Sequence, residues 1–192
     1  MRSSFYLVVP FVIASTVALP PNATTASNSS SLFFSASSKT VSALDDATIV
    51  FIYDEANSAD IETGQLAVER GSTKEVRDFG ATLVRDHNAA RQLGRDLAKK
   101  LGVTPAPLAD DPYAKGHVDA MAKLKPLHGK EFDKAFMKHE VAYHVAVIDA
   151  IQNTLLPATK NAELKALEIK IVPAFQGHLV MAQTLEKKIF AM

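Results

Sequence analysis

The stretch "LVRDHNAARQL", residues 83–93, decides the fold class and also raises the question of function. Leu83, His87 and Ala90 are separated by four and three residues, the spacing that places side chains on one face of an α-helix. The titratable imidazole of His87 therefore occupies a position where a core-facing leucine is expected. This position raises the question of whether His87 has a chemical role.

The same helical period extends over most of the chain beyond residue 43. Four long segments show it, at about 45–70, 72–102, 130–155 and 161–189. No segment alternates with a period of two residues, so we expect no β-sheet. Tight links at Gly71 and Pro157 separate the segments into two pairs, and the proline-rich residues 103–129 join the pairs. The sequence predicts an all-α, ferritin-like four-helix bundle of two antiparallel hairpins with a long crossover.

Three local signals predict where these helices begin, end and bend. Ser72 and Glu75 have the spacing of a capping box at the start of the second helix. Pro157 is expected to end the third helix, and Pro173 to kink the fourth. The reason is that proline lacks an amide donor and its ring clashes with the preceding turn.

The N-terminal part of the chain has a different composition. Residues 1–20 combine a positive start, an apolar run and small residues before a possible cleavage point, which predicts a signal peptide. A membrane anchor is the rival interpretation, but the run is shorter than the ~20 residues that a span needs and contains Pro10. Residues 21–43 are rich in Ser and Thr and are expected to be a disordered linker before the domain at 44–191. We therefore expect export to the periplasm, outer envelope or extracellular space.

Composition excludes several classes of function. The chain has no cysteine, so thiolate catalysis, iron–sulfur clusters and cysteine-type zinc sites are excluded. Lys plus Arg equals Asp plus Glu, at 21 each, which argues against a nucleic-acid partner. We also expect no integral membrane domain once the signal peptide is removed. A protein partner stays open.

Three of the six histidines lie on the apolar faces of three different helices: His87, His144 and His178. A single core-facing histidine is usually a buried, hydrogen-bonded residue. Each of three would need its own partner to avoid a desolvation cost of roughly 1–3 kcal/mol. One shared metal ion would satisfy all three, with carboxylates as the remaining ligands.

Carboxylates suitable for such a site are present on the first and third helices. Glu62 and Glu55 share one stripe of the first helix, and Glu140 stands one turn before His144. Asp86 points away from His87 and suits a supporting role. Counting residues along straight helices places His87, His144 and Glu55 at one level, and His178 and Glu62 about 8 Å away. The candidate metal ligands are His87, His144, His178, Glu62 and Glu55.

The stretches "EANSADIETGQLAVERGSTKEVRDFGATLVRDHNAARQL", "GKEFDKAFMKHEVAYHVAVID" and "IVPAFQGHLVMAQTL" resemble the bacterial exported proteins grouped as domain of unknown function 4142. The resemblance spans roughly residues 46 to 190. Its motifs fall on Glu62, Gly64, Leu66 and Ala67, on Asp86 and His87, on Phe132 and Asp133, on His144, and on Pro173 and His178. It implies a ferritin-like bundle and export, but no activity.

The sequence departs from ferritin-like di-iron proteins. Those carry Glu-x-x-His on two helices, whereas Val84, Val141 and Phe175 stand three residues before the three core histidines here. Iron is therefore disfavoured and zinc or a similar divalent ion is preferred. We expect storage, sensing or scavenging rather than catalysis, with no catalytic residue assigned. The alternative is a structural or interaction bundle of the cell envelope whose core histidines are hydrogen-bonded.

Overall fold

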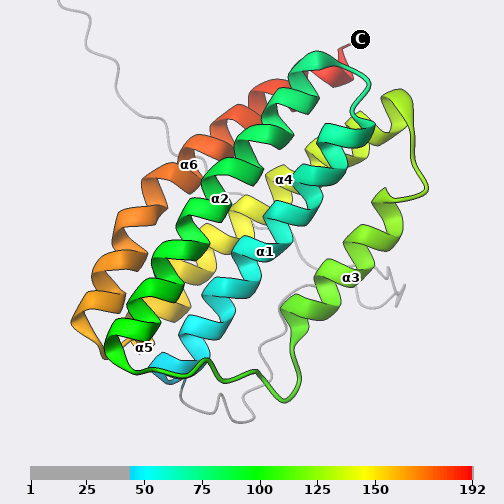
Figure 1. The fold of residues 1–192 in the computed structure, drawn as a ribbon. Helices are drawn as coiled ribbons and strands as arrows, with labels where there is room; N and C mark the ends of the chain where they lie inside the picture. The colour runs from blue at the N-terminus through cyan, green and yellow to red at the C-terminus, as the bar shows by residue number, and fades with distance from the viewer. Residues whose placement is uncertain (1–43, 192) are drawn as a thin grey trace, which may run out of the picture. The chain divides into compact units, whose positions relative to one another are not determined.

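The computed structural model of the chain describes residues 44–191, which form helices and connections without a β-strand (Figure 1). The prediction of an all-α fold is confirmed for this part of the chain. The predicted signal peptide and linker, residues 1–43, lie outside the described residues. The elements in chain order are α1 (Asp46–Arg70), α2 (Lys74–Leu101), α3 (Pro112–Leu124), α4 (Gly129–Ala150), a π-helical turn η1 (Ile151–Leu155), α5 (Leu156–Ala158) and α6 (Ala162–Phe190).

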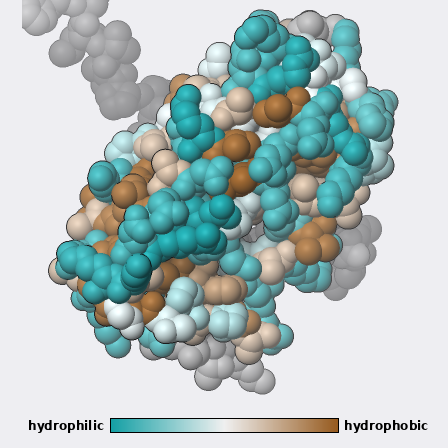
Figure 2. Space-filling model, viewed as in Figure 1, coloured by the Kyte–Doolittle hydropathy of each residue, from teal (hydrophilic) through white to brown (hydrophobic). Residues whose placement is uncertain are grey.

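The long helices pack as two hairpins. α1 packs along α2 and α4 along α6, while contacts of α2 with α6 and of α1 with α4 join the hairpins (Figure 1). The connection after α2 contains α3, which lies beside α1 and α4. No helix within residues 44–191 combines the length and the apolar composition needed to cross a membrane. Figure 2 shows polar residues over much of one face, with apolar residues interspersed.

The link between α1 and α2 is held by a buried carboxylate from α4. Asp133 accepts hydrogen bonds from Ser72 N (2.8 Å), Ser72 Oγ (2.6 Å) and Thr73 N (3.2 Å). The N-cap of α2 is Thr73, whose hydroxyl accepts from Val76 N at 3.3 Å. The predicted cap at Ser72 is therefore wrong by one residue, because the Ser72 hydroxyl binds Asp133 instead.

Pro157 does not end the third long helix. The chain stays helical through η1 and α5 as far as Ala158, and Pro157 lies in the first turn of α5. A π-helical turn widens the helix and changes which carbonyl faces each amide, so the missing proline amide is accommodated without a break. Thr159 then closes the end by donating from N (2.8 Å) and Oγ1 (2.9 Å) to Leu155 O.

Two apolar clusters fill the interior, one toward each end of the helices. One contains Ile49, Ile148, Ile151, Leu164 and Phe175, and the other contains Phe79, Leu83, Phe132, Phe136 and Ala182. Along every long helix, a buried polar segment separates the residues of one cluster from those of the other. This polar layer contains Asn57, Asp60, His87, Glu140, His144 and His178.

α1 and α2 touch through two glycines close to this layer. A Cβ atom built on Gly64 would lie 2.8 Å from Gly80 O, and one built on Gly80 would lie 2.6 Å from Gly64 O. Real Cβ atoms essentially never approach a carbonyl oxygen so closely. The backbones of α1 and α2 therefore meet directly, one helical turn from Asp60.

Candidate metal centre

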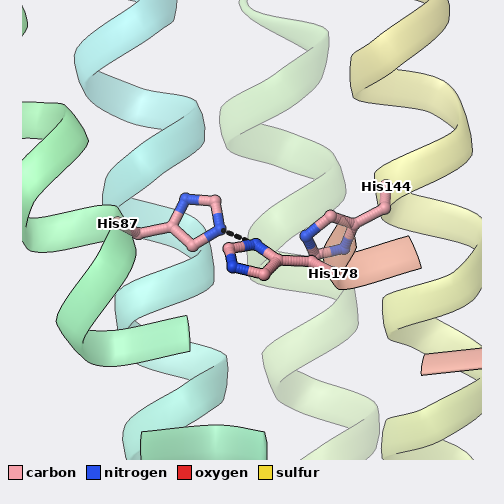
Figure 3. A group of neighbouring side chains, drawn as sticks. All are labelled: His87, His144 and His178. Atoms are coloured by element: carbon pink, nitrogen blue, oxygen red, sulfur yellow. Dashed lines mark hydrogen bonds between the residues drawn. The ribbon is translucent and has the colours of Figure 1, made fainter. Parts of the chain in front are cut away.

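Three imidazoles from three helices meet in the polar layer (Figure 3). One ring nitrogen from each of His87 (α2), His144 (α4) and His178 (α6) lies within 4.8 Å of the other two. The ring centroids are 5.1 to 5.8 Å apart. The three side chains are buried, with exposed fractions of 1%, 1% and 3%. The count that placed His178 in a separate layer is wrong.

Counts from the observed helix ends show where that error lies. His87 lies 14 residues before the end of α2, and His144 lies 14 residues before the end of α5. His178 lies 16 residues after the start of α6. A difference of two residues corresponds to only about 3 Å of rise. The three histidines therefore share one level, and the count from the sequence overstated the distance of His178 from the start of its helix.

The hydrogen bonds of His87 determine which of its nitrogens carries the proton. His87 Nδ1 lies 3.0 Å from Asn57 Oδ1. Asn57 Nδ2 donates to Tyr53 O at 2.8 Å, which identifies Oδ1 as the acceptor end of the amide. His87 Nδ1 therefore donates to Asn57, and the lone pair is on Nε2.

The other two imidazoles are oriented in the same way. His178 Nε2 donates to Asp86 Oδ2 at 3.1 Å, and His144 Nδ1 donates to the backbone oxygen of Glu140 at 3.0 Å. Asp86 is ionised, since the hydrogen bond from Arg85 lowers its pKa. The lone pairs are consequently on His178 Nδ1 and His144 Nε2.

The three lone pairs converge on the interior of the cluster. His87 Nε2 and His178 Nδ1 face each other at 3.2 Å, and the assigned tautomers place no proton between them. His144 Nε2 is buried and has no hydrogen-bond partner among the described residues. Facing lone pairs repel unless a positive centre lies between them, so the arrangement is incomplete as it stands.

Two buried carboxylates adjoin the imidazoles. Asp60 Oδ2 lies 3.5 Å from His87 Nε2, and Asp60, Glu140 and His144 each offer one ligand atom within 4.8 Å of the others. Their exposed fractions are 3% for Asp60 and 0% for Glu140. Asp60 Oδ1 and both carboxylate oxygens of Glu140 have no hydrogen-bond partner among residues 44–191. Such orphaned acceptors are uncommon in folded proteins, so the packing of the protein alone does not account for these two carboxylates.

Burial shifts the titration of these groups toward their neutral forms. Burial, together with His178 and His144, lowers the pKa of His87 to about 2, and burial lowers the pKa of His144 to about 4. Burial raises the pKa of Glu140 to about 7, and burial with the charge of Glu140 raises the pKa of Asp60 well above its ordinary value. The lone pairs of His87 and His144 are therefore free at neutral pH, and no Lys or Arg pairs with the two buried carboxylates in the described part of the chain.

The structure does not bring Glu62 or Glu55 to this cluster. Glu62 is exposed and its Oε2 lies 2.8 Å from His117 Nε2, while Glu55 is half-buried between α1 and α3. The carboxylate of α1 that lies beside the imidazoles is Asp60, and not Glu55 or Glu62 as the sequence predicted. Its spacing from Ala56 and Thr63 was an available signal. However, α1 is covered by α2, α3 and α4, so its apolar pattern does not single out one face.

The other three histidines lie outside the cluster of imidazoles. Burial lowers the pKa of His139 to about 4. The side chain of His117 is only 19% exposed because it binds Glu62 across the groove between α3 and α1. His128 is exposed.

Comparison with known proteins connects the chain to one family. Residues 33–185 match the sequence model of a family described as Domain of unknown function (DUF4142). The match contains all three imidazoles and both buried carboxylates. No curated protein and no solved structure gives a significant match to the chain.

Proposed function

The chain belongs to the DUF4142 family, and we propose that it binds a divalent metal ion between its long helices. His87, His144 and His178 supply imidazole nitrogens, and Asp60 and Glu140 supply carboxylate oxygens. The proposal is supported by analogy with ferritin-like bundles, in which facing helices contribute ligands to a central site. The family predicted from the sequence is confirmed, and this family has no assigned function.

The observation that carries this proposal is the orientation of the imidazoles. Each donates its outer N–H to a fixed acceptor: Asn57 Oδ1, Asp86 Oδ2 or the backbone oxygen of Glu140. Metal-binding histidines characteristically donate their second N–H to a carboxylate or carbonyl in this way. The 3.2 Å between His87 Nε2 and His178 Nδ1 is close to the ~3.3 Å expected for two nitrogens around a tetrahedral zinc ion with bonds of ~2.05 Å.

Charge supports the same conclusion. Two buried carboxylates without a cation are costly when ionised, and no Lys or Arg side chain forms a salt bridge with either within residues 44–191. A divalent cation would balance both carboxylates and leave the interior with no net charge. His87 and His144 would remain neutral, as their lowered pKa values require.

The donor set favours zinc. Imidazole nitrogens and carboxylate oxygens without sulfur suit zinc and similar borderline ions. Iron is less favoured, because the cluster has only two carboxylates and lacks the Glu-x-x-His pairs of di-iron proteins.

Storage, sensing or scavenging of the ion accounts for the closed surroundings better than catalysis does. The three imidazoles are at most 3% exposed and Phe175 stacks on His87 with a centroid distance of 4.9 Å, which leaves little room for a substrate. The predicted signal peptide supports a site of action outside the cytoplasm, in the periplasm, outer envelope or extracellular space.

Metal analysis of untagged protein, purified without chelator, tests the proposal. We expect stoichiometric zinc in the parent, loss of the metal in His87→Ala and His144→Ala, and retention in His128→Ala, which removes an exposed histidine. A metal-free parent whose melting temperature is unchanged by added zinc would overturn the proposal. That result would favour the alternative, a structural or interaction bundle whose core histidines serve only as hydrogen-bonding groups.

A further inference from the structure

An open groove of about 380 Å³ lies between α1 and α3, outside the layer that contains the metal centre. Its walls include Glu55 and Glu62 from α1, Tyr113 and His117 from α3, and Tyr143 from α4. α3 lies beside α1 in Figure 1 and forms the outer wall. The packing of the long helices does not require this groove, because those helices bury their apolar faces against one another.

The inner end of the groove lies next to the metal centre. Tyr143 closes this end by donating from its hydroxyl to Ala56 O on α1 at 3.0 Å. Asp60 stands one helical turn from Ala56, and Glu140 stands three residues before Tyr143, so each lies beside a residue of this bridge. Both are more than nine-tenths buried and carry unpartnered oxygens. The two carboxylates without partners therefore lie just beyond the inner end of the groove.

The groove also has the charge to attract a cation. Glu55 Oε2 is buried there without a hydrogen-bond partner. Burial and the neighbouring Asp111 carboxylate raise the pKa of Glu55 to about 7, so this carboxyl is partly ionised at neutral pH and available to a cation. Glu62 adds a third carboxylate at the rim, beside the imidazole of His117.

The opposite approach to the imidazoles is less suitable. Asp86 is 34% exposed and contacts His178, but Arg85 binds both of its carboxylate oxygens at 2.7 and 3.0 Å. The guanidinium neutralises Asp86 and repels an arriving metal ion. Of the two approaches, only the α1–α3 groove joins a cavity to carboxylates that lack a cation.

We propose that the α1–α3 groove is the path by which the divalent ion enters and leaves the centre, with Glu55 and Glu62 collecting the ion and Tyr143 closing the inner end. This inference rests on the proposed function. The ion passes from the carboxylates of the groove to Asp60 and Glu140, and then to the imidazoles.

A residue on a path has a kinetic signature that differs from that of a ligand. It changes the barrier for entry and for exit by the same factor, so the dissociation constant at equilibrium stays the same. Tyr143→Ala removes the ring and the bridge to Ala56, and we expect both rates to rise about tenfold or more. Tyr143→Phe keeps the ring and removes only the hydrogen bond, and we expect a smaller rise of about threefold in both rates.

The carboxylates of the groove are tested separately. The double variant Glu55→Gln/Glu62→Gln keeps the shape of the side chains and removes their charge. Entry and exit should both slow by about tenfold at low ionic strength, and the difference from the parent should shrink as salt screens the groove. The control Glu69→Gln/Glu131→Gln changes the net charge equally at exposed positions of α1 and α4, and should keep the parental rates.

Stopped-flow mixing with Co²⁺ measures the entry rate through the visible absorption of the bound ion, and chelator capture measures the exit rate. Equilibrium competition with a chelator gives the dissociation constant of each full-length variant. Equal changes in both rates at constant affinity support the path. If the groove variants keep the parental rates, the path is overturned and the metal centre is unaffected. The same holds if a variant changes the affinity through the exit rate alone, because that is the signature of a ligand. A parent that binds no Co²⁺ at equilibrium overturns the metal centre itself.

Discussion

Asp133 and Glu140 lie seven residues apart on α4, and both are almost fully buried, with exposed fractions of 1% and 0%. Asp133 accepts three hydrogen bonds from Ser72 and Thr73, the residues that link α1 to α2. Neither carboxylate oxygen of Glu140 accepts any within the described part of the chain. The same helix therefore contains one buried carboxylate that is satisfied by the protein and one that is not.

The difference separates a structural role from a ligand-binding role. A carboxylate that accepts two or three backbone and hydroxyl hydrogen bonds is stable when buried and ionised, and it fixes the geometry of its donors. Glu140 gains no such set of hydrogen bonds, although it lies beside Asp60 and His144 in the buried polar layer. Burial alone does not mark a functional residue. Burial without partners does.

The largest expected effect is on metal affinity. Glu140→Gln should weaken zinc binding by on the order of 10²-fold, because structural zinc binding of ~10–16 kcal/mol is shared among four or five ligands. The unfolding free energy of the metal-free variant should not fall, since glutamine is uncharged. Chelator competition and urea denaturation measure the two quantities. Unchanged zinc affinity would mean that Glu140 is not a ligand and that the contrast with Asp133 has another cause.

The reciprocal change should affect stability and leave the metal centre intact. Asp133→Asn should lower the unfolding free energy by about 2–3 kcal/mol, since three donors at the link between α1 and α2 lose their charged acceptor. Zinc affinity should stay the same, because Asp133 lies two helical turns from Glu140. Urea denaturation in the presence of chelator provides the measurement. A loss of zinc affinity without a loss of stability would reverse the two roles.

The pH dependence of stability provides a finer test. Burial raises the pKa of Glu140 from 4.5 to about 7, so the stabilisation from its protonated form is complete below about 4.5 and is lost as pH rises through about 7. In metal-free protein, the stability difference between Glu140→Gln and the parent should therefore grow in favour of the variant by roughly 1–3 kcal/mol between about pH 5 and about pH 8.

His87 and His144 contribute the opposite slope, since their lowered pKa values cost stability as pH falls below 6.5. Both proteins contain these histidines, so their contribution cancels in the difference. Asp60 does not cancel, because the charge of Glu140 raises its pKa in the parent, and the loss of that charge in the variant adds to the difference with the same sign. Urea titrations in chelator at several pH values test the expectation. A difference that stays constant with pH would show that Glu140 titrates normally.

The smallest expected effect is on the free energy of unfolding, from loss of the Ser72 hydroxyl that donates to Asp133. Ser72→Ala removes one of the three hydrogen bonds and keeps the one from Ser72 N, so the unfolding free energy should fall by about 1 kcal/mol. Thr184→Ala is a suitable control, because Thr184 Oγ1 is exposed and bonds only to Val180 O of its own helix. Its effect should stay within about 0.5 kcal/mol. Equal melting temperatures for Ser72→Ala and the parent would contradict the structural role of Asp133.

The sequence was sufficient to predict which histidines face the interior, because apolar spacing defines the inward face of a regular helix. It was insufficient for their levels along the helices. The level of His178 depends on where α6 begins, and the structure places that start at Ala162. Helix ends shift by a residue or two with their packing and caps, so counting along straight helices gives levels only approximately.

The carboxylates show a different limit. Asp60 and Glu62 both have apolar neighbours at helical spacing, and the choice between them depends on the rotation of α1 against α2, α3 and α4. The structural role of Asp133 could not be predicted, because its partners Ser72 and Thr73 are about 60 residues away in the chain. The rotation of a helix and the distant partners of a side chain depend on tertiary packing, and the periodicity of the sequence does not predict either.

The contact between Gly64 and Gly80 has a consequence for which ions the protein can hold. These glycines let the backbones of α1 and α2 meet, and a methyl group at either position would collide with a carbonyl oxygen at 2.8 Å or less. Separating the two helices would draw Asp60 away from His87, since each belongs to one of them. In the metal centre that we propose, selectivity for ionic radius would thus depend in part on the absence of side chains at two positions that do not contact the ion.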